Sequence, residues 1–173
     1  MYVIYNLVKP LKEIKNDELH IARRNLPHWQ IGESLYFITF RAKEGIQLDG
    51  SARDAVIGVI LEYHKKYYDL SSAVVMHDHA HIIIKPLKKY NDVYYSLSEI
   101  LKMIKGKSAR KINSSLRLKR SIWQAESFDR IIRDEKELAE KCLYIRNNPV
   151  KGGLAEKPDD YPWLLEIQEV VEK

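Results

Sequence analysis

Two histidines, His79 and His81, are separated by one residue and followed by a run of isoleucines. Alternate side chains of a β-strand point to the same face, so both imidazoles would project from one face while Ala80 and Ile82 turn to the other. Two imidazoles about 7 Å apart along a strand can bind one divalent ion between them, with oxygen ligands in the remaining positions of its coordination shell. The alternative is an inert, hydrogen-bonded pair at the mouth of a hairpin. His77 has the same parity but falls in the expected turn, so it is either a substitute ligand or a bystander.

A tyrosine and an asparagine near the end of the chain are spaced to share one helix face, because Tyr144 and Asn148 are four residues apart. The amide oxygen could serve as a neutral metal ligand, and the phenol could attack a phosphodiester that the metal has polarised. A free phenol has a pKa of about 10, so attack at neutral pH needs a metal, cations or a base. Lys141, Arg146 and Lys151 supply positive charge nearby. The competing interpretation is a core tyrosine, and spacing alone does not single out Tyr144.

A basic segment lies between Glu99 and Glu126, where the sequence has no acidic residue. Like charges repel each other unless something anionic lies alongside, so this segment could follow a nucleic-acid backbone. It could equally be a solvated helix face. Trp123 or Phe128 could stack on an unpaired base, although core packing explains either aromatic as well. The cations of the segment are Lys102, Lys105, Lys107, Arg110, Lys111, Arg117, Lys119 and Arg120.

Hydrophobic periodicity and turn residues predict the elements that would position these side chains. Ser96 and Glu99 are in capping-box register and begin one helix, which Gly106 interrupts or ends. Pro149 closes the last helix, because the residue before a proline is pushed out of the α region. In order, the sequence predicts a strand over 34–42, a helix from an N-cap at Ser51 to about Tyr68, strands over 73–76 and 80–86 joined by a tight turn, the Ser96 helix, strand-like pieces over 122–132, and a helix from Asp134 to about Asn147.

This order, two βαβ units whose inner strands meet in a hairpin, predicts an α+β fold. We expect a ferredoxin-like or RRM-like antiparallel sheet with helices on one face, plus a C-terminal helix that carries Tyr144. The length of 173 residues suits a single domain over 1–173, with residues 1–25 as a loose arm. One cysteine excludes an internal disulfide, and no apolar run approaches 18 residues. We therefore expect a cytoplasmic protein without a membrane partner.

Short motifs in a fixed order resemble those of the Y1 transposases, the IS200/IS605 type, and more narrowly the REP-associated tyrosine transposases. They cover most of the chain. The matching segments are 26–29 (LPHW), 36–40 (YFITF), 75–82 (VMHDHAHI), 122–124 (IWQ), 127–134 (SFDRIIRD), 144–150 (YIRNNPV), 153–154 (GL) and 160–163 (DYPW).

The resemblance implies a catalytic tyrosine at Tyr144 and metal ligands at His79, His81 and Asn148, with Mg²⁺ or Mn²⁺ as the cofactor. It also implies a homodimer that cuts single-stranded DNA beside hairpins, leaves a 5′-phosphotyrosine and a free 3′-OH, and works at the nucleoid. Two positions depart from the family pattern. His77 stands where relatives often carry proline, so ligation could involve it, and Ala80 is a small residue in the hydrophobic slot.

Three other functions compete with this one. A non-catalytic DNA- or RNA-binding module would show no dependence on metal or on the two histidines. A two-histidine phosphoesterase of another kind needs two separated His-x-Thr/Ser motifs, which this sequence lacks. A domesticated transposase would share the chemistry, so the sequence does not separate it from a mobile element.

Overall fold

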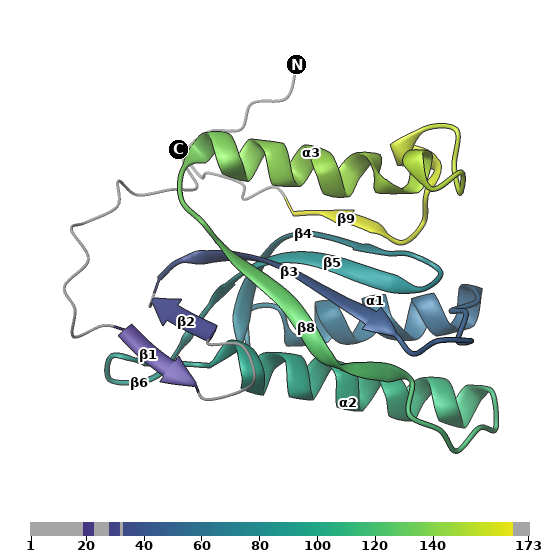
Figure 1. Ribbon diagram of the computed structural model, residues 1–173, viewed down its shortest axis with the longest axis horizontal. Helices are drawn as coiled ribbons and strands as arrows, with labels where there is room; N and C mark the ends of the chain where they lie inside the picture. The colour runs from purple at the N-terminus through teal and green to yellow at the C-terminus, as the bar shows by residue number, and fades with distance from the viewer. Residues whose placement is uncertain (1–18, 23–27, 32, 168–173) are drawn as a thin grey trace.

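A five-stranded antiparallel sheet organises the chain in this computed structural model, which describes residues 19–22, 28–31 and 33–167. The strands lie in the order β8-β3-β5-β4-β9 (Figure 1). The first four of these have the strand order and crossovers of a ferredoxin-like fold, which confirms the predicted fold class. The strands are β3 (Leu35–Ala42), β4 (Tyr68–Val75), β5 (His79–Pro86), β8 (Trp123–Ile132) and β9 (Leu164–Glu166).

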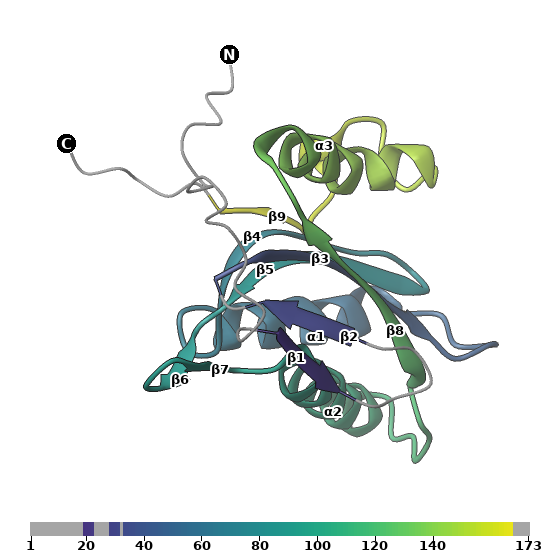
Figure 2. The same ribbon diagram turned by 60° about the vertical axis from the view of Figure 1, so that its left-hand side comes forward.

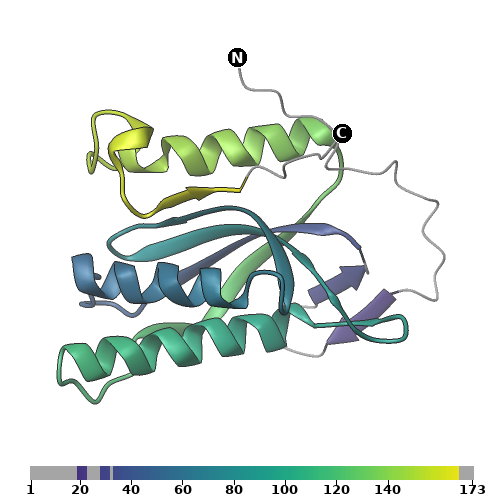
Figure 3. The same ribbon diagram turned by 180° about the vertical axis from the view of Figure 1, so that it is seen from behind.

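The helices lie on both faces of the sheet. Helices α1 (Gly50–Tyr63) and α2 (Leu97–Ser115) cover one face, and α3 (Glu135–Lys151) lies across the other (Figures 2 and 3). The prediction of helices on one face therefore holds for α1 and α2, while the C-terminal helix occupies the opposite face.

Two hydrophobic cores follow from the alternation of side chains along the strands. On β5, Ala80, Ile82 and Ile84 are buried in the core beneath α1 and α2. Ile83 faces the other way, into a smaller core with Leu138 and Ile145 of α3. His79 and His81 share the parity of Ile83, so the histidine face of the sheet is the face that α3 covers.

The remaining elements are small. Strands β1 (Leu19–Ala22) and β2 (His28–Ile31) pair with each other, β6 (Lys88–Tyr90) pairs with β7 (Val93–Tyr94), and η2 (Pro158–Asp160) precedes β9. The predicted arm over residues 1–25 falls mostly outside the described residues, apart from β1. Within the described ranges, no helix combines the length and the apolar character that a membrane span requires.

Helix α1 differs from its prediction at both ends. Asp49, rather than Ser51, is the N-cap, and its Oδ1 accepts a hydrogen bond of 2.8 Å from the Ala52 amide. The helix ends at Tyr63, because Lys65 takes a left-handed conformation with φ of 62°. The chain from Tyr68 onward instead pairs with β5.

Helices α2 and α3 both run past the residues that were expected to end them. Gly106 lies inside α2, where a glycine costs about 1 kcal/mol relative to alanine, and buried Ile104 and Ser108 on either side hold the helix in place. Pro149 lies inside the last turn of α3 and is buried. The helix ends instead at a Schellman motif, in which Gly153 has φ of 67° and the amide of Leu154 donates to the Pro149 carbonyl at 2.8 Å.

Candidate active site

The two predicted histidine ligands lie together on β5 with their rings in contact. The ring centroids of His79 and His81 are 4.7 Å apart at an interplanar angle of 73°. Sheet register places Thr39 of β3 opposite His81 on one side and Val74 of β4 opposite it on the other. The pair therefore sits in the middle of the sheet rather than at a frayed edge.

His81 is buried, and only one of its two ring nitrogens has a partner. Its Nδ1 is 2.7 Å from the Thr39 hydroxyl, while its Nε2 is buried without a hydrogen-bond partner among the described residues. Burial, with the neighbouring charge of His79, lowers the pKa of His81 to about 3. The ring is therefore neutral at physiological pH, and one nitrogen keeps a lone pair for a ligand.

His79 is held by the residue that precedes it. Its Nδ1 lies 2.5 Å from Asp78 Oδ1, and the other carboxylate oxygen of Asp78 accepts from Arg41 at 3.3 Å. Burial raises the pKa of Asp78, but the His79 hydrogen bond and the charges of His79, His77 and Arg41 outweigh it and hold that pKa below its usual value. A carboxylate on Nδ1 orients the ring and leaves Nε2 available, as in many metal-bound histidines.

Helix α3 places Tyr144 against this pair. The Tyr144 ring centroid is 5.2 Å from that of His81 and 5.9 Å from that of Phe37, both in edge-on geometry. Tyr144 is 40% exposed, so the core interpretation of this tyrosine is wrong. The Lys151 ammonium lies 5.7 Å from the Tyr144 ring centroid, and the Lys141 ammonium lies 5.1 Å from that of Phe37.

The helical spacing extends this arrangement to Asn148. Lys141, Tyr144, Asn148 and Lys151 follow each other at intervals of three, four and three residues, which aligns them along one stripe of α3. Asn148 is half-buried, one turn beyond Tyr144.

Two imidazoles and an amide oxygen are donor types that suit a divalent cation. Among the described residues, no group of three His, Cys, Asp or Glu side chains gathers closely enough to hold an ion. The buried, unpartnered Nε2 of His81 nevertheless indicates a missing ligand, since buried polar atoms are nearly always satisfied. His79, His81 and the Asn148 amide could hold the ion, with phosphate or water oxygens in its remaining positions.

Two other predicted contributors are His77, which lies in the turn as expected, and Arg146. His77 lies in the turn before β5, with its Nε2 3.7 Å from Asp78 Oδ1. Arg146 forms ion pairs with Glu166 and Asp159, so its charge is neutralised at the end of the sheet and does not serve Tyr144.

The basic segment lies mainly on α2, on the opposite face of the sheet from the histidines (Figure 1). Three of its cations are used within the fold. The Lys105 ammonium donates to Ser127 Oγ at 3.0 Å, Lys107 forms an ion pair with Glu62, and Lys111 lies 3.9 Å from the same carboxylate. The exposed members, for which no ion pair is found in the described part of the chain, are Lys102, Arg110, Arg117, Lys119 and Arg120.

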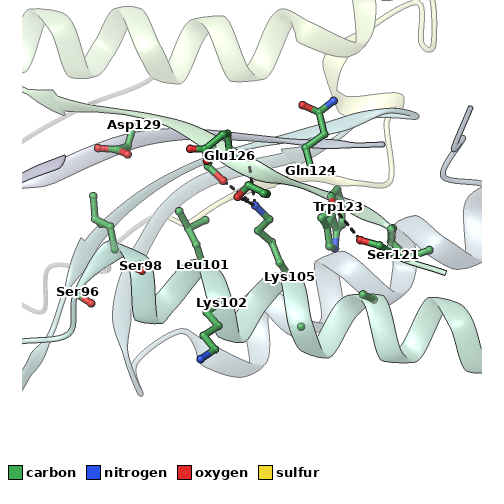
Figure 4. Close-up of a pocket in the computed structure, with 16 residues that line it drawn as sticks. Ser96, Ser98, Leu101, Lys102, Lys105, Ser121, Trp123, Gln124, Glu126 and Asp129 are labelled. Carbon is green, nitrogen blue, oxygen red and sulfur yellow. Dashed lines mark hydrogen bonds between the residues drawn. The ribbon is translucent and has the colours of Figure 1, made fainter. Parts of the chain in front are cut away.

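The prediction that Trp123 stacks on a base is wrong, because this residue is 5% exposed. Its ring packs against Phe40, and its Nε1 donates to the buried Ser108 hydroxyl at 3.0 Å. Trp123 forms the floor of a groove of about 530 Å³ between α2 and β8 (Figure 4). Lys102 and Lys105 line the groove from α2, and Glu126 and Asp129 line it from β8.

Sequence reasoning missed Thr39 and Asp78 as partners of the two histidines. Asp78 could have been found, because it directly precedes His79 in the chain. Thr39 could not, because its partnership with His81 depends on the register between β3 and β5.

One relative matches most of the chain in sequence. A putative REP-associated tyrosine transposase from Haemophilus influenzae (strain ATCC 51907 / DSM 11121 / KW20 / Rd) is 27% identical over 144 residues, which cover 75% of this chain and 77% of the relative.

Two solved structures share the fold. A REP-associated tyrosine transposase bound to a REP hairpin matches with a TM-score of 0.65 at 23% identity, over 82% of each chain. A bacterial tRNA(His) guanylyltransferase-like protein in complex with GTP matches with a TM-score of 0.52 at 12% identity, over 77% of this chain and 73% of the other. The fold therefore hosts different chemistries, and the site has to decide between them.

The family model that matches covers residues 33–148, from the strand that carries Thr39 to the helix turn that ends at Asn148. The chain belongs to the family of IS200-like transposases.

Proposed function

We propose that this transposase-family chain cuts and rejoins single-stranded DNA, with Tyr144 as the nucleophile. The observation that carries the proposal is the 5.2 Å separation between the ring centroids of Tyr144 and His81, two residues that are 63 positions apart in the sequence (144 − 81). A half-exposed phenol beside a buried neutral imidazole, with the Lys151 ammonium over its ring, is suited to attack on a phosphodiester.

In the proposed step, the Tyr144 oxygen bonds to phosphorus and the bond from phosphorus to the 3′ oxygen breaks. The phenolic proton is lost, the leaving oxygen gains a proton to become a 3′-OH, and the DNA stays attached through a 5′-phosphotyrosine. A different 3′-OH can then displace the tyrosine, which completes strand transfer without a nucleotide cofactor.

A divalent ion, Mg²⁺ or Mn²⁺, would neutralise charge that develops on the phosphate oxygens. His79 and His81 would hold it through their Nε2 atoms, because their Nδ1 atoms face Asp78 and Thr39. Asn148 would add a neutral oxygen from the helix that carries Tyr144. Lys141 and Lys151 would attract the incoming phosphate.

The proposed substrate is single-stranded DNA that carries a hairpin, because one structural relative is bound to a REP hairpin. A homodimer and a cytoplasmic, nucleoid-associated location belong to the same proposal and stay predictions.

The test is to incubate the chain with end-labelled, hairpin-bearing single strands, with and without Mn²⁺, and to separate the products on denaturing gels. We expect a metal-dependent covalent protein–DNA adduct, abolished by Tyr144→Phe while DNA affinity stays near that of the unmodified chain. Tyr90→Phe is the matched control, since Tyr90 is also exposed but lies on the β6–β7 hairpin. An adduct that persists in Tyr144→Phe would remove this residue from the role. Binding without any adduct would favour a non-catalytic nucleic-acid-binding protein.

A further inference from the structure

A large aromatic side chain lies open to solvent on the same sheet face as the histidines. Phe128 of β8 is 58% exposed. Its backbone is in register with Thr39, which is in turn in register with His81. Phe128, Thr39 and His81 therefore form one row across three adjacent strands, and neighbouring strands are only about 4.8 Å apart.

Helix α3 leaves this end of the row uncovered. It packs mainly on β4 and β5, and it meets β8 further along that strand, where Ile132 shares the smaller core and Arg130 forms an ion pair with Glu137. The ring of Phe128 consequently belongs to neither hydrophobic core.

The side chains on this face of the sheet favour a ligand that carries both negative charge and flat apolar rings, as a single strand of DNA does. On the same face of β3, Arg41 has a side chain that is 54% exposed, and the Lys141 ammonium stands over Phe37. An exposed aromatic ring on a protein face that also carries cations is the usual arrangement for stacking a base of single-stranded nucleic acid.

We infer that Phe128 is a stacking platform for one unpaired base of the DNA strand, within the first few nucleotides of the phosphate that Tyr144 attacks. This inference rests on the proposed function, because it assumes a single strand crossing the α3 face of the sheet. Phe128 is a binding residue in it and has no part in the chemical step.

The test measures equilibrium binding of the full chain to a fluorescent oligodeoxythymidylate in EDTA, where no metal supports cleavage. Phe128→Ala should weaken binding about tenfold, the effect of losing one base–aromatic stack, while Phe128→Trp should keep or raise the affinity. Tyr90→Ala is the matched control, because Tyr90 is 60% exposed but lies on a hairpin on the other side of the sheet from α3 (Figure 1). It should bind like the unmodified chain.

A second probe separates base stacking from contact with the backbone. Replacing the thymines by abasic sites should weaken binding of the unmodified chain and leave Phe128→Ala little affected, so that the two proteins bind the abasic strand alike. Equal affinity of Phe128→Ala and the unmodified chain for the thymidylate strand would overturn the inference. A change of oligomeric state in Phe128→Ala without this base-dependent loss would also overturn it, because the ring would then serve a contact between copies.

These outcomes are independent of the covalent adduct. If Tyr144→Phe still formed an adduct, the assignment of the nucleophile would fail while the stacking result stood. If Phe128→Ala bound the thymidylate normally while Tyr144→Phe lost the adduct, the platform would fail while the proposed function stood.

Discussion

Each histidine of the site has its Nδ1 beside a neighbouring side chain, and Nε2 of His81 is buried without a hydrogen-bond partner in the described part of the chain. Thr39 faces Nδ1 of His81, and Asp78 faces Nδ1 of His79. An imidazole that coordinates a cation through Nε2 must carry its proton on Nδ1, and the Thr39 hydroxyl then accepts that proton's hydrogen bond. In the proposed function, Thr39 and Asp78 are thus positioning residues, which would set the tautomer and the ring angle of the two histidines without touching the ion.

Thr39→Val tests this role, because valine has nearly the same shape but lacks the hydroxyl. The change leaves a buried nitrogen of His81 without a partner, so we expect the free energy of unfolding to fall by about 1–3 kcal/mol. We also expect the affinity for Mn²⁺ to fall about tenfold or more. Calorimetric titration of Mn²⁺ and denaturant unfolding measure the two effects without reference to activity.

Thr39→Ser is the control, since it keeps the hydroxyl and should restore most of the Mn²⁺ affinity. If the Thr39→Val and Thr39→Ser proteins both bound Mn²⁺ as tightly as the unmodified chain, Thr39 would have no positioning role and its hydrogen bond would be structural only.

At the scale of elements, the four main strands and the starts of α2 and α3 were predictable, while the start of α1 and the helix ends were not. The Ser96–Glu99 capping box and the Asp134 cap are both present, because each depends on residues a few positions apart. Gly106 and Pro149 were expected to end helices because of their own backbone preferences. Both helices continue past them, because Ile104 and Ser108 beside Gly106 are buried and Pro149 is itself buried. Tyr144 could be placed on a helix from the sequence, but its 5.2 Å approach to His81 depends on how α3 docks on the sheet.

The capping box gives α2 a pH dependence. The Glu99 carboxylate accepts a hydrogen bond from the Ser96 backbone amide and lies beside the Lys89 ammonium, and these contacts lower the pKa of Glu99 from its ordinary 4.5 to about 2. A carboxylate with a lowered pKa stabilises the fold above its unfolded value, and this stabilisation is lost as pH falls from 4.5 toward 2. We expect thermal unfolding to show this loss, and Glu99→Gln to remove part of it, since glutamine can hold the cap but does not titrate. An unchanged acid dependence in Glu99→Gln would show that this carboxylate contributes nothing.

At the scale of the whole molecule, the sheet separates two sets of cations. One set, on α2 and the loop after it, was visible in the sequence as a segment without acids. The other set stands beside the site and was only partly visible, because Arg41 joins Lys141 and Lys151 through folding. At one end of the sheet the segment after α2 joins the strand that carries Arg41, because the backbone amide of Lys43 donates to the Ile122 carbonyl and that of Ala42 donates to the Asp78 carbonyl. A single strand of DNA bound along the loop that carries Arg117 and Arg120 could pass around this end of the sheet to reach the histidines.

The two sets should therefore have separable effects. Replacing Arg117 and Arg120 by glutamine removes two exposed charges remote from the reacting atoms. We expect the slope of log affinity against log salt concentration for single-stranded DNA to flatten by about 1.4, since each phosphate contact contributes about 0.7. The rate of adduct formation at saturating DNA should not change.

Replacing Lys141 and Lys151 by glutamine should mainly change the rate instead. This change should slow adduct formation about ten- to a hundredfold, because the Lys141 ammonium lies 5.1 Å from the Phe37 ring centroid and the Lys151 ammonium lies 5.7 Å from that of Tyr144. It should alter the salt dependence of binding less than the loss of two phosphate contacts would. Single-turnover gels at saturating DNA and titrations at several salt concentrations separate the two quantities. If both double variants changed affinity and rate in the same proportion, the sheet would not divide binding from chemistry, and the DNA would have to reach the site by another path.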